Sequence, residues 1–377
     1  MFNSEYIALL EKDIDKFDEI FKGFTYYKDT LSVSGWTITS FGGALYYGDE
    51  FSPIKNNQNK ITVKDSGKAA ITKLQQLLEN NNFKTNFIND IILNDVPISN
   101  EGPMSDFAYY WSKKNGKKIT SVSKIPMLEM LSLFQIVPTL IKNYIYNNAN
   151  WLIYGDRVTF AMNRYNAIKT YSYLDLLPEL SSNTSNESNF LSIRTELSHQ
   201  PYGLDKNGEL IVDNYPDIEN RSFYSSNAAY NSARGTILLL NKYFDWMKKN
   251  NVWDNSIIIL YSDHGNNCYD NNLPSSLDEE EKLYISRANA LYMIKPLNCN
   301  DDFKIDLSLK SNGDILYDVF NLLGIENDMQ PCTKEGIRYY SFMKNIDDYF
   351  QNKNFVNYAS YKIKGSIFNK DSWKKIE

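Results

Sequence analysis

The chain has 377 residues, a formal net charge of -6 and a hydrophobic content of 42%. This length is enough for one large α/β domain or two ordinary ones, with ample core. The acidic balance gives no electrostatic case for a nucleic-acid partner. Its three cysteines are an odd number without CxxC spacing, which argues against a disulfide framework.

Targeting signals are not evident in the sequence. The opening "MFNSEYIALLEKDIDKFDEIF" lacks a basic region followed by an apolar one, so we expect no signal peptide. The best membrane candidate is 127–146, which contains Glu129, Pro138 and Lys142 and never reaches about 18 uninterrupted apolar residues. We therefore predict a core-facing helix there and no transmembrane helix.

The first half of the chain predicts helices that alternate with strands. The opening segment has apolar residues at helical spacing. Residues 23–35, rich in Tyr, Thr and Val, predict a strand that runs into a glycine turn. A helix and a second strand are predicted at 67–90, and a third strand at 189–197.

The second half continues the alternation. Residues 225–250 predict a long helix, and the apolar run 257–260 fits a strand buried on both faces. A strand is predicted at 288–296, and a helix at 314–324 that ends at Gly324. The fold class predicted is α/β, with a mixed, mostly parallel sheet and helices on both faces.

Both histidines of the chain follow predicted strands, where α/β proteins bind ligands. Asp263 and His264 lie where the strand that begins at Ile257 stops, and their side chains could bind Zn or Mn. The structural alternative is a helix-capping Asp beside a partly buried His. His199, in "LSHQPYG", suggests a shared site; its alternative is a histidine bonded to a turn carbonyl.

A nucleophile is less clearly indicated. The sequence has neither a GxSxG elbow nor a Gly-rich phosphate loop. Residues 32–43, "SVSGWTITSFGG", could place small hydroxyl side chains at a helix N-terminus that favours an anion. A threonine hydroxyl would need a metal ion to become a good nucleophile at neutral pH.

Three motifs, in order along the chain, resemble the sulfatase-like branch of the alkaline phosphatase superfamily, which includes lipoteichoic acid synthases, phosphoethanolamine transferases and sulfatases. They are "GFTYYKDTLSVSGWTITS", "LSHQPYG" and "YFDWMKKNNVWDNSIIILYSDHG". The resemblance implies an alkaline-phosphatase-like fold and a divalent metal (Zn, Mn, Mg or Ca). It implies a lipid- or glycan-linked phosphoester substrate, with a membrane surface as a further partner.

The resemblance also implies roles for single residues. Asp263 and His264 would be metal ligands, and His199 would contact the transferred group. Thr37 matches the nucleophile and a further metal ligand, because Ser40 completes a T-x-x-S pattern; Thr39 is the competing register. The hydroxyl would attack phosphorus to give phosphothreonine, and a second hydroxyl or water would then take the group.

The sequence departs from the family at two places. Upstream of Thr37 we find a helix-like segment, in which Glu5, Glu11 and Asp13 indicate a solvated face, instead of a strand with an acidic metal ligand. "SNGDI" replaces a His-x-Asp pattern, which leaves Asn312 as a candidate substrate-binding residue and Asp314 as an uncertain one.

These departures leave alternatives to the transferase or hydrolase open. One is a catalytically incomplete remnant, and another is a sulfuric ester hydrolase, which the lack of a C/S-x-P-S-R motif disfavours. A carbohydrate-binding module is a weaker alternative than either, because core packing explains most of the aromatic residues. We expect a catalytic domain at 1–345 that lacks an N-terminal strand, and an extension at 346–377 that packs on it. The resemblance implies an extracytoplasmic, membrane-anchored location, as in the family, whereas this sequence as given shows no signal peptide or transmembrane helix.

Overall fold

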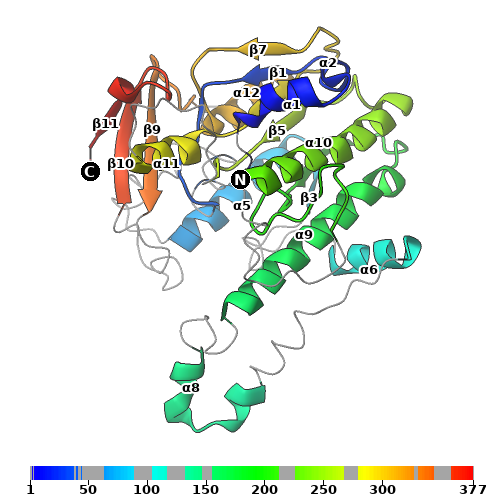
Figure 1. Cartoon of the computed structure of the whole chain (residues 1–377). Helices are drawn as coiled ribbons and strands as arrows, with labels where there is room; N and C mark the ends of the chain where they lie inside the picture. Colours follow the sequence, from blue (N-terminus) through cyan, green and yellow to red (C-terminus); the bar gives the residue numbers. More distant parts are fainter. Residues whose placement is uncertain are drawn as a thin grey trace. The chain divides into compact units, whose positions relative to one another are not determined.

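The computed structural model describes residues 2, 4–37, 40, 44, 63–88, 104–116, 132–146, 155–211, 226–266, 279–326, 330–343 and 358–376 (Figure 1). The chain divides into two compact units. Unit 1 comprises Met1–Glu101, Asn183–Ser192 and Phe244–Glu377, and unit 2 comprises Gly102–Ser182 and Ile193–Tyr243. Thr37, Asp263 and His264 therefore belong to unit 1, whereas His199 belongs to unit 2.

A four-stranded sheet lies in unit 1. Its order is β5 (Ile258–Tyr261), β6 (Tyr292–Lys295), β1 (Thr25–Tyr27) and β7 (Lys304–Asp306). β6 is antiparallel to both β5 and β1, and β7 is parallel to β1. All four residues of β6 are buried. The sheet is mixed, as predicted.

Helices cover both faces of this sheet. Successive side chains of a strand point to opposite faces, so each strand contributes side chains to both layers. On one face, Tyr292 and Ile294 pack with Ile315 of α12 (Ile315–Leu323). On the other, Phe24 packs against Phe244 of α10 (Ser226–Lys249), and the Tyr26 hydroxyl lies 2.6 Å from the Ser4 hydroxyl. The predicted mixed α/β class is confirmed.

Two helices occupy the segment before β1. They are α1 (Tyr6–Asp13) and α2 (Phe17–Ile20), separated where Lys16 adopts a left-handed φ of 59°. In the described segment 4–24 they are the only regular elements, in agreement with the predicted helical spacing. Glu11 and Asp13 are exposed as expected, but the carboxylate of Glu5 is buried.

Two small sheets complete the site-bearing part of unit 1. β2 (Thr30–Leu31) pairs in parallel with β8 (Lys310–Ser311), and β8 leads into the short 3-10 helix η4 (Asn312–Asp314). β3 (Phe83–Ile88) pairs with β4 (Ser188–Ile193). The apolar face of α5 (Val63–Asn80) packs on Phe87 and Phe320, which links this sheet to α12.

The C-terminal sheet of unit 1 is antiparallel. It contains β9 (Ile337–Met343), β10 (Tyr358–Lys364) and β11 (Trp373–Lys375), with the 3-10 helix η5 (Lys370–Ser372) before β11. Trp373 packs against Ile285 of α11 (Glu279–Ala288). β9 and β10 pair across the boundary predicted at residue 345, and that boundary stays a prediction.

Unit 2 is helical in its described part. It contains α6 (Met104–Lys114), α8 (Thr139–Tyr146), α9 (Gly155–Leu180) and most of α10. The Trp111 ring of α6 packs edge-on against Tyr171 of α9, and its Nε1 donates to Asp175 at 2.8 Å. A search of the described helices finds none long and apolar enough to cross a membrane.

Three expectations need correction. The segment 127–146 was expected to face the core, but in its described part Ile136 is 79% and Tyr144 67% exposed. The run 257–260 was expected to be buried on both faces, but β5 is half-buried because it ends the strand order. A mostly parallel sheet was expected, but the chain returns from α11 into β6 antiparallel to β5, so antiparallel pairs prevail among the described pairings.

Candidate active site

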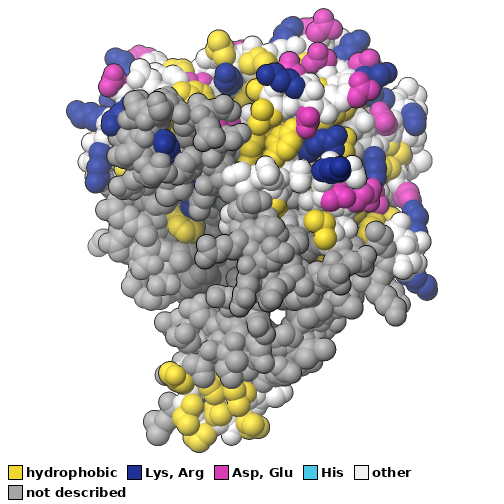
Figure 2. Space-filling view, in the orientation of Figure 1, with side chains coloured by type: hydrophobic (Ala, Val, Ile, Leu, Met, Phe, Trp, Pro, Cys, Tyr) yellow, Lys and Arg dark blue, Asp and Glu magenta, His cyan; other side chains and the backbone are white. Residues whose placement is uncertain are grey.

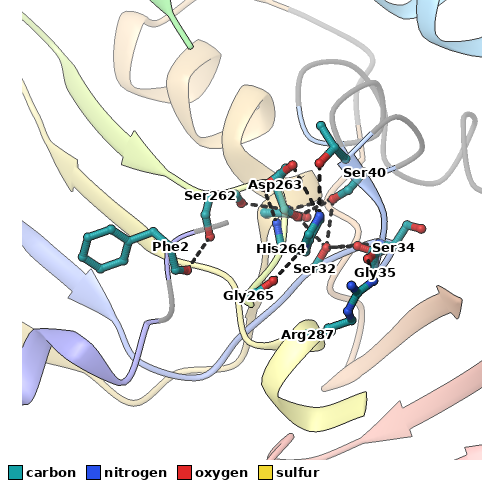
Figure 3. Close-up of polar contacts among 12 residues, drawn as sticks. Phe2, Ser32, Ser34, Gly35, Ser40, Ser262, Asp263, His264, Gly265 and Arg287 are labelled. Carbon is teal, nitrogen blue, oxygen red and sulfur yellow. Dashed lines mark hydrogen bonds and ion pairs between the residues drawn. The ribbon is translucent and has the colours of Figure 1, made fainter. Parts of the chain in front are cut away.

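The candidate site begins where β5 ends. Ser262, Asp263 and His264 follow the strand, and the Ser262 hydroxyl donates to the Phe2 carbonyl at 3.1 Å (Figure 3). The Gly265 amide then donates to the Arg287 carbonyl at 2.9 Å. A Cβ at position 265 would lie only 1.9 Å from the Ser286 carbonyl oxygen. The residue after His264 must therefore be glycine for the loop to take this path.

The imidazole of His264 is oriented by its own loop. Its Nδ1 lies 2.5 Å from the Gly265 carbonyl oxygen, which can only accept a hydrogen bond. Nδ1 therefore carries the proton, and Nε2 presents a lone pair. Nε2 lies 3.2 Å from the Thr37 Oγ1 and 3.6 Å from the Asp263 Oδ2.

The protonation state of His264 follows from its surroundings. The side chain is only 2% exposed, and this burial lowers its pKa to about 4, although the Asp263 carboxylate acts in the opposite direction. The Arg287 charge lowers the pKa further. At neutral pH the ring is therefore uncharged.

These groups fit a divalent cation. The Nε2 lone pair and the Asp263 carboxylate oxygen lie 3.6 Å apart, and a neutral imidazole places no proton between them. Nitrogen and oxygen donors of this kind suit Zn or Mn. The part of the chain that the structure describes has no cluster of three or more His, Cys, Asp or Glu that could bind a metal; beside Asp263 and His264, the Thr37 hydroxyl is a further oxygen donor, 3.2 Å from the His264 Nε2.

A group of buried polar side chains fixes the backbone of Asp263. Its carbonyl oxygen accepts hydrogen bonds from the Ser32 hydroxyl at 2.6 Å, from the Ser40 hydroxyl and from the Asn312 amide at 2.7 Å. The hydroxyl oxygens of Ser32 and Ser40 lie 2.8 Å from each other. We call Ser32, Ser40 and Asn312 the carbonyl clamp. It holds the Asp263–His264 loop against the segment that bears Thr37.

Asn312 uses its whole side chain for this purpose. It has no exposed surface; its Oδ1 accepts from the Val33 amide at 3.0 Å while Nδ2 donates to Asp263. A positioning role is therefore better supported than the predicted substrate contact. Asp314 accepts from the Ser311 amide at 2.7 Å and from the Thr333 hydroxyl at 2.6 Å, so it has a capping role.

Two further groups hold the turn before Thr37. The Arg287 Nη1 donates to the Gly35 carbonyl at 3.0 Å, and its guanidinium lies 4.8 Å from the centre of the Trp36 ring. The Gly35 amide donates to the Ser341 carbonyl at 3.2 Å. The roles of Ser32, Arg287 and Ser341 could not be predicted from the sequence, because no local pattern indicates their contacts with Asp263 and Gly35.

His199 has a similar local geometry in unit 2. It is half-buried, and its Nδ1 lies 2.5 Å from the Gln200 carbonyl oxygen, which leaves Nε2 as the acceptor, as in His264. β4 ends at Ile193, so His199 follows the strand by six residues instead of ending it. Its place in a shared site stays a prediction, and Thr39 lies outside the described residues.

Comparison with known proteins gives one family. Residues 134–291 match the Sulfatase family, a stretch that includes His199, Asp263 and His264 but not Thr37. The match covers less than half of the chain and supports the resemblance for the two motifs that lie within it, "LSHQPYG" and "YFDWMKKNNVWDNSIIILYSDHG". A search of curated proteins found no match.

Solved structures give distant likenesses. A protein in the alkaline phosphatase superfamily from Vibrio parahaemolyticus shares 13% identity at a TM-score of 0.49, covering 100% of this chain and 79% of that one. Lipoteichoic acid synthase LtaP from Listeria monocytogenes shares 14% identity at a TM-score of 0.45, covering 96% of this chain and 79% of that one. The C-terminal periplasmic domain of EcEptC from Escherichia coli, in complex with Zn, shares 12% identity at a TM-score of 0.48, covering 99% of this chain and 85% of that one. All three TM-scores are below 0.5, so we base no functional assignment on them.

Proposed function

Since this chain contains a sulfatase-family region at residues 134–291, we propose that it is a metal-dependent transferase or hydrolase of phosphoester groups with Thr37 as its nucleophile. One observation carries the proposal. The Thr37 Oγ1 lies 3.2 Å from a histidine nitrogen whose lone pair is directed there by the Nδ1 contact with Gly265. A hydroxyl and an imidazole nitrogen this close together could bind one cation, and a metal-bound hydroxyl is an activated nucleophile.

The site residues would share the work as follows. Asp263, His264 and Thr37 would hold the divalent metal, which when bound would lower the pKa of the hydroxyl and neutralise negative charge. The carbonyl clamp would keep Asp263 and His264 facing Thr37. Arg287 would fix the turn before the nucleophile, and His199 would contact the transferred group.

The reaction would proceed in two displacements. In the first, a bond forms between the Thr37 Oγ1 and phosphorus as the bond to the leaving alcohol breaks; the hydroxyl loses its proton and the alcohol leaves with one. In the second, water or an acceptor hydroxyl attacks phosphorus, loses its proton and releases the threonine as a hydroxyl. Lipid- or glycan-linked phosphoesters of the cell envelope are the substrates that we propose.

The nucleophile is tested by substitution. We expect Thr37→Ala to lower the turnover of an aryl phosphodiester by on the order of 10³-fold, and Thr37→Ser to retain part of it, because serine keeps the hydroxyl. Mass spectrometry of the quenched wild type should locate a phosphoryl group on the peptide that contains Thr37. Full activity of Thr37→Ala together with loss in Thr39→Ala would contradict the assignment.

The metal is tested by elemental analysis of the purified protein. Wild type should contain a divalent metal, and Asp263→Ala should contain much less, because one of three donors is removed. Asp301→Ala is a suitable control, since Asp301 is an exposed carboxylate that pairs with Lys304 at 2.6 Å.

A catalytically incomplete remnant is the second candidate. The observation that favours it is that the described residues contain no group of three or more His, Cys, Asp or Glu side chains that could bind a metal. This candidate predicts metal in neither wild type nor Asp263→Ala, and no turnover of aryl phosphodiesters. Turnover of an aryl sulfate in preference to the phosphodiester would instead support a sulfuric ester hydrolase.

A further inference from the structure

Unit 2 exposes an apolar surface at α8. A helical segment at 132–136 and α8 meet at Pro138, and Ile145 is buried among Leu133, Phe134 and Val137. Ile136, Ile141 and Tyr144 remain 79%, 45% and 67% exposed. We call these three the α8 patch. Figure 2 shows hydrophobic side chains gathered at α8. The small core explains why the element folds but not why three large apolar side chains face solvent, and contiguous exposed apolar groups usually mark a binding surface.

The charge of the surrounding sequence indicates what this surface binds. The protein has a net charge of -6, yet residues 107–155 contain six lysines and one acidic residue, Glu129. Of these lysines, Lys113 is exposed at the end of α6 and Lys114 pairs with Glu179, whereas Lys142 lies on α8 with its Nζ 5.1 Å from the Phe134 ring centre. The positive charge and the apolar patch thus occur in one stretch of an otherwise acidic chain.

We propose that the α8 patch docks unit 2 on an anionic lipid surface. Apolar and aromatic side chains beside a lysine, here Lys142, are a combination that inserts into the headgroup region of a bilayer, with the ammonium group held at the anionic headgroups. The eight residues of α8 rise about 12 Å, against a hydrocarbon core of about 30 Å, so the helix lies at the interface. A second copy of this chain would bury the apolar groups but would bring the lysines of the two copies together.

This inference deepens the proposed function and rests on it in one respect: if the substrate is lipid-linked, it would lie in the surface on which the protein docks. The binding itself is independent of turnover. Either proposal can therefore fail while the other stands.

Vesicle flotation of the full chain tests the docking. Wild type should float with vesicles that contain phosphatidylglycerol and much less with phosphatidylcholine alone, and added salt should weaken binding. Ile136→Asp should weaken it at least tenfold. The matched control is Leu307→Asp, because Leu307 is 71% exposed but belongs to unit 1. Circular dichroism checks that both variants fold.

Three results would overturn the inference. They are no flotation of wild type, equal loss in Leu307→Asp and Ile136→Asp, and a dimer in sedimentation that Ile136→Asp dissociates while vesicle binding is unchanged. Turnover of a soluble aryl phosphodiester should be the same in Ile136→Asp and wild type. Flotation as expected without turnover in any sample would reject the proposed function and leave the docking site in place.

Discussion

At the scale of single residues, Asn312 links two parts of the site that are distant in sequence. Replacing it by alanine would leave the Val33 amide without its acceptor and would remove one of the hydrogen-bond donors to the Asp263 carbonyl. A buried polar group without its partner costs about 1–3 kcal/mol. We expect Asn312→Ala to lower the unfolding midpoint, and to lower kcat with little change in KM, because Thr37 and His264 would no longer be held in register.

The matched control for Asn312→Ala is Asn300→Ala, which removes an exposed side chain that donates to Asp254 at 3.1 Å. It should change neither stability nor kcat. A rise in KM with unchanged stability in Asn312→Ala would instead support the direct substrate contact that the sequence predicted.

His264 predicts a pH dependence of stability in the metal-stripped protein. Its pKa is about 4 when folded, because of burial, against about 6.5 when unfolded. Between these values the unfolded chain binds more protons, so the free energy of unfolding rises with pH. The contribution is complete above pH 6.5 and is lost as the pH falls towards 4, by about 3 kcal/mol in full.

Urea unfolding at pH 7 and pH 4.5 measures this loss. Other carboxylates also titrate in that range, so the comparison is with His264→Asn, which keeps a donor near the position of Nδ1 but has no titrating ring. Wild type should lose more stability than the variant on acidification. Equal losses would show that His264 is already solvated.

The sequence located some site residues and not others for a physical reason. Asp263 and His264 directly follow a strand with a strong apolar pattern, and the end of a strand is where α/β proteins bind ligands. Ser32 and Asn312 act through partners 231 and 279 residues away. No local periodicity encodes such contacts, which depend on how the strands pair.

At the scale of elements, the C-terminal sheet is tied to the β1–β2 turn by one buried ion pair. The Arg338 Nη2 lies 2.9 Å from the Asp29 Oδ1 and also donates to the Gly365 carbonyl at 2.6 Å, and Arg338 has no exposed surface. Removing one partner of a buried pair costs about 3–5 kcal/mol, because the other charge remains buried. We expect Asp29→Asn to lower the free energy of unfolding by this amount, as measured in urea.

An exposed pair is the control for Asp29→Asn. Lys16 and Glu19 lie 3.5 Å apart with both side chains mostly exposed, so Glu19→Gln should leave stability unchanged within error. The loss in Asp29→Asn should extend to activity, because β9 contributes Ser341, whose carbonyl accepts from Gly35. A stable Asp29→Asn would mean that the carbonyl acceptors alone satisfy Arg338.

Helices and strands with a clear period were predicted well. α10 and α12 lie within two residues of the predicted bounds, and the Gly324 stop is confirmed by its left-handed φ of 66°. Strand direction was not predicted well, because period 2 is common to parallel and antiparallel strands. The exposure of the α8 segment was not predicted for a related reason: an apolar run looks the same in sequence whether it faces a core or solvent.

At the scale of the whole molecule, the division into two units separates the two histidines. Thr37 and His264 meet within unit 1, whereas His199 and the α8 patch belong to unit 2. The fold class and the resemblance to the Sulfatase family could be predicted because they depend on element order and short motifs. The division into units could not, because unit 1 is assembled from three separate stretches of chain.

The carbonyl clamp also determines when the site can first exist. Asp263 follows Ser32 by 231 residues and Asn312 follows Val33 by 279. During synthesis the ribosome must therefore produce most of the chain before the clamp can close. Until Asn312 has emerged from the exit tunnel, the nascent polypeptide lacks one of the three donors that fix the Asp263 carbonyl. A pause in translation before that residue would therefore leave the Asp263–His264 loop incompletely fixed.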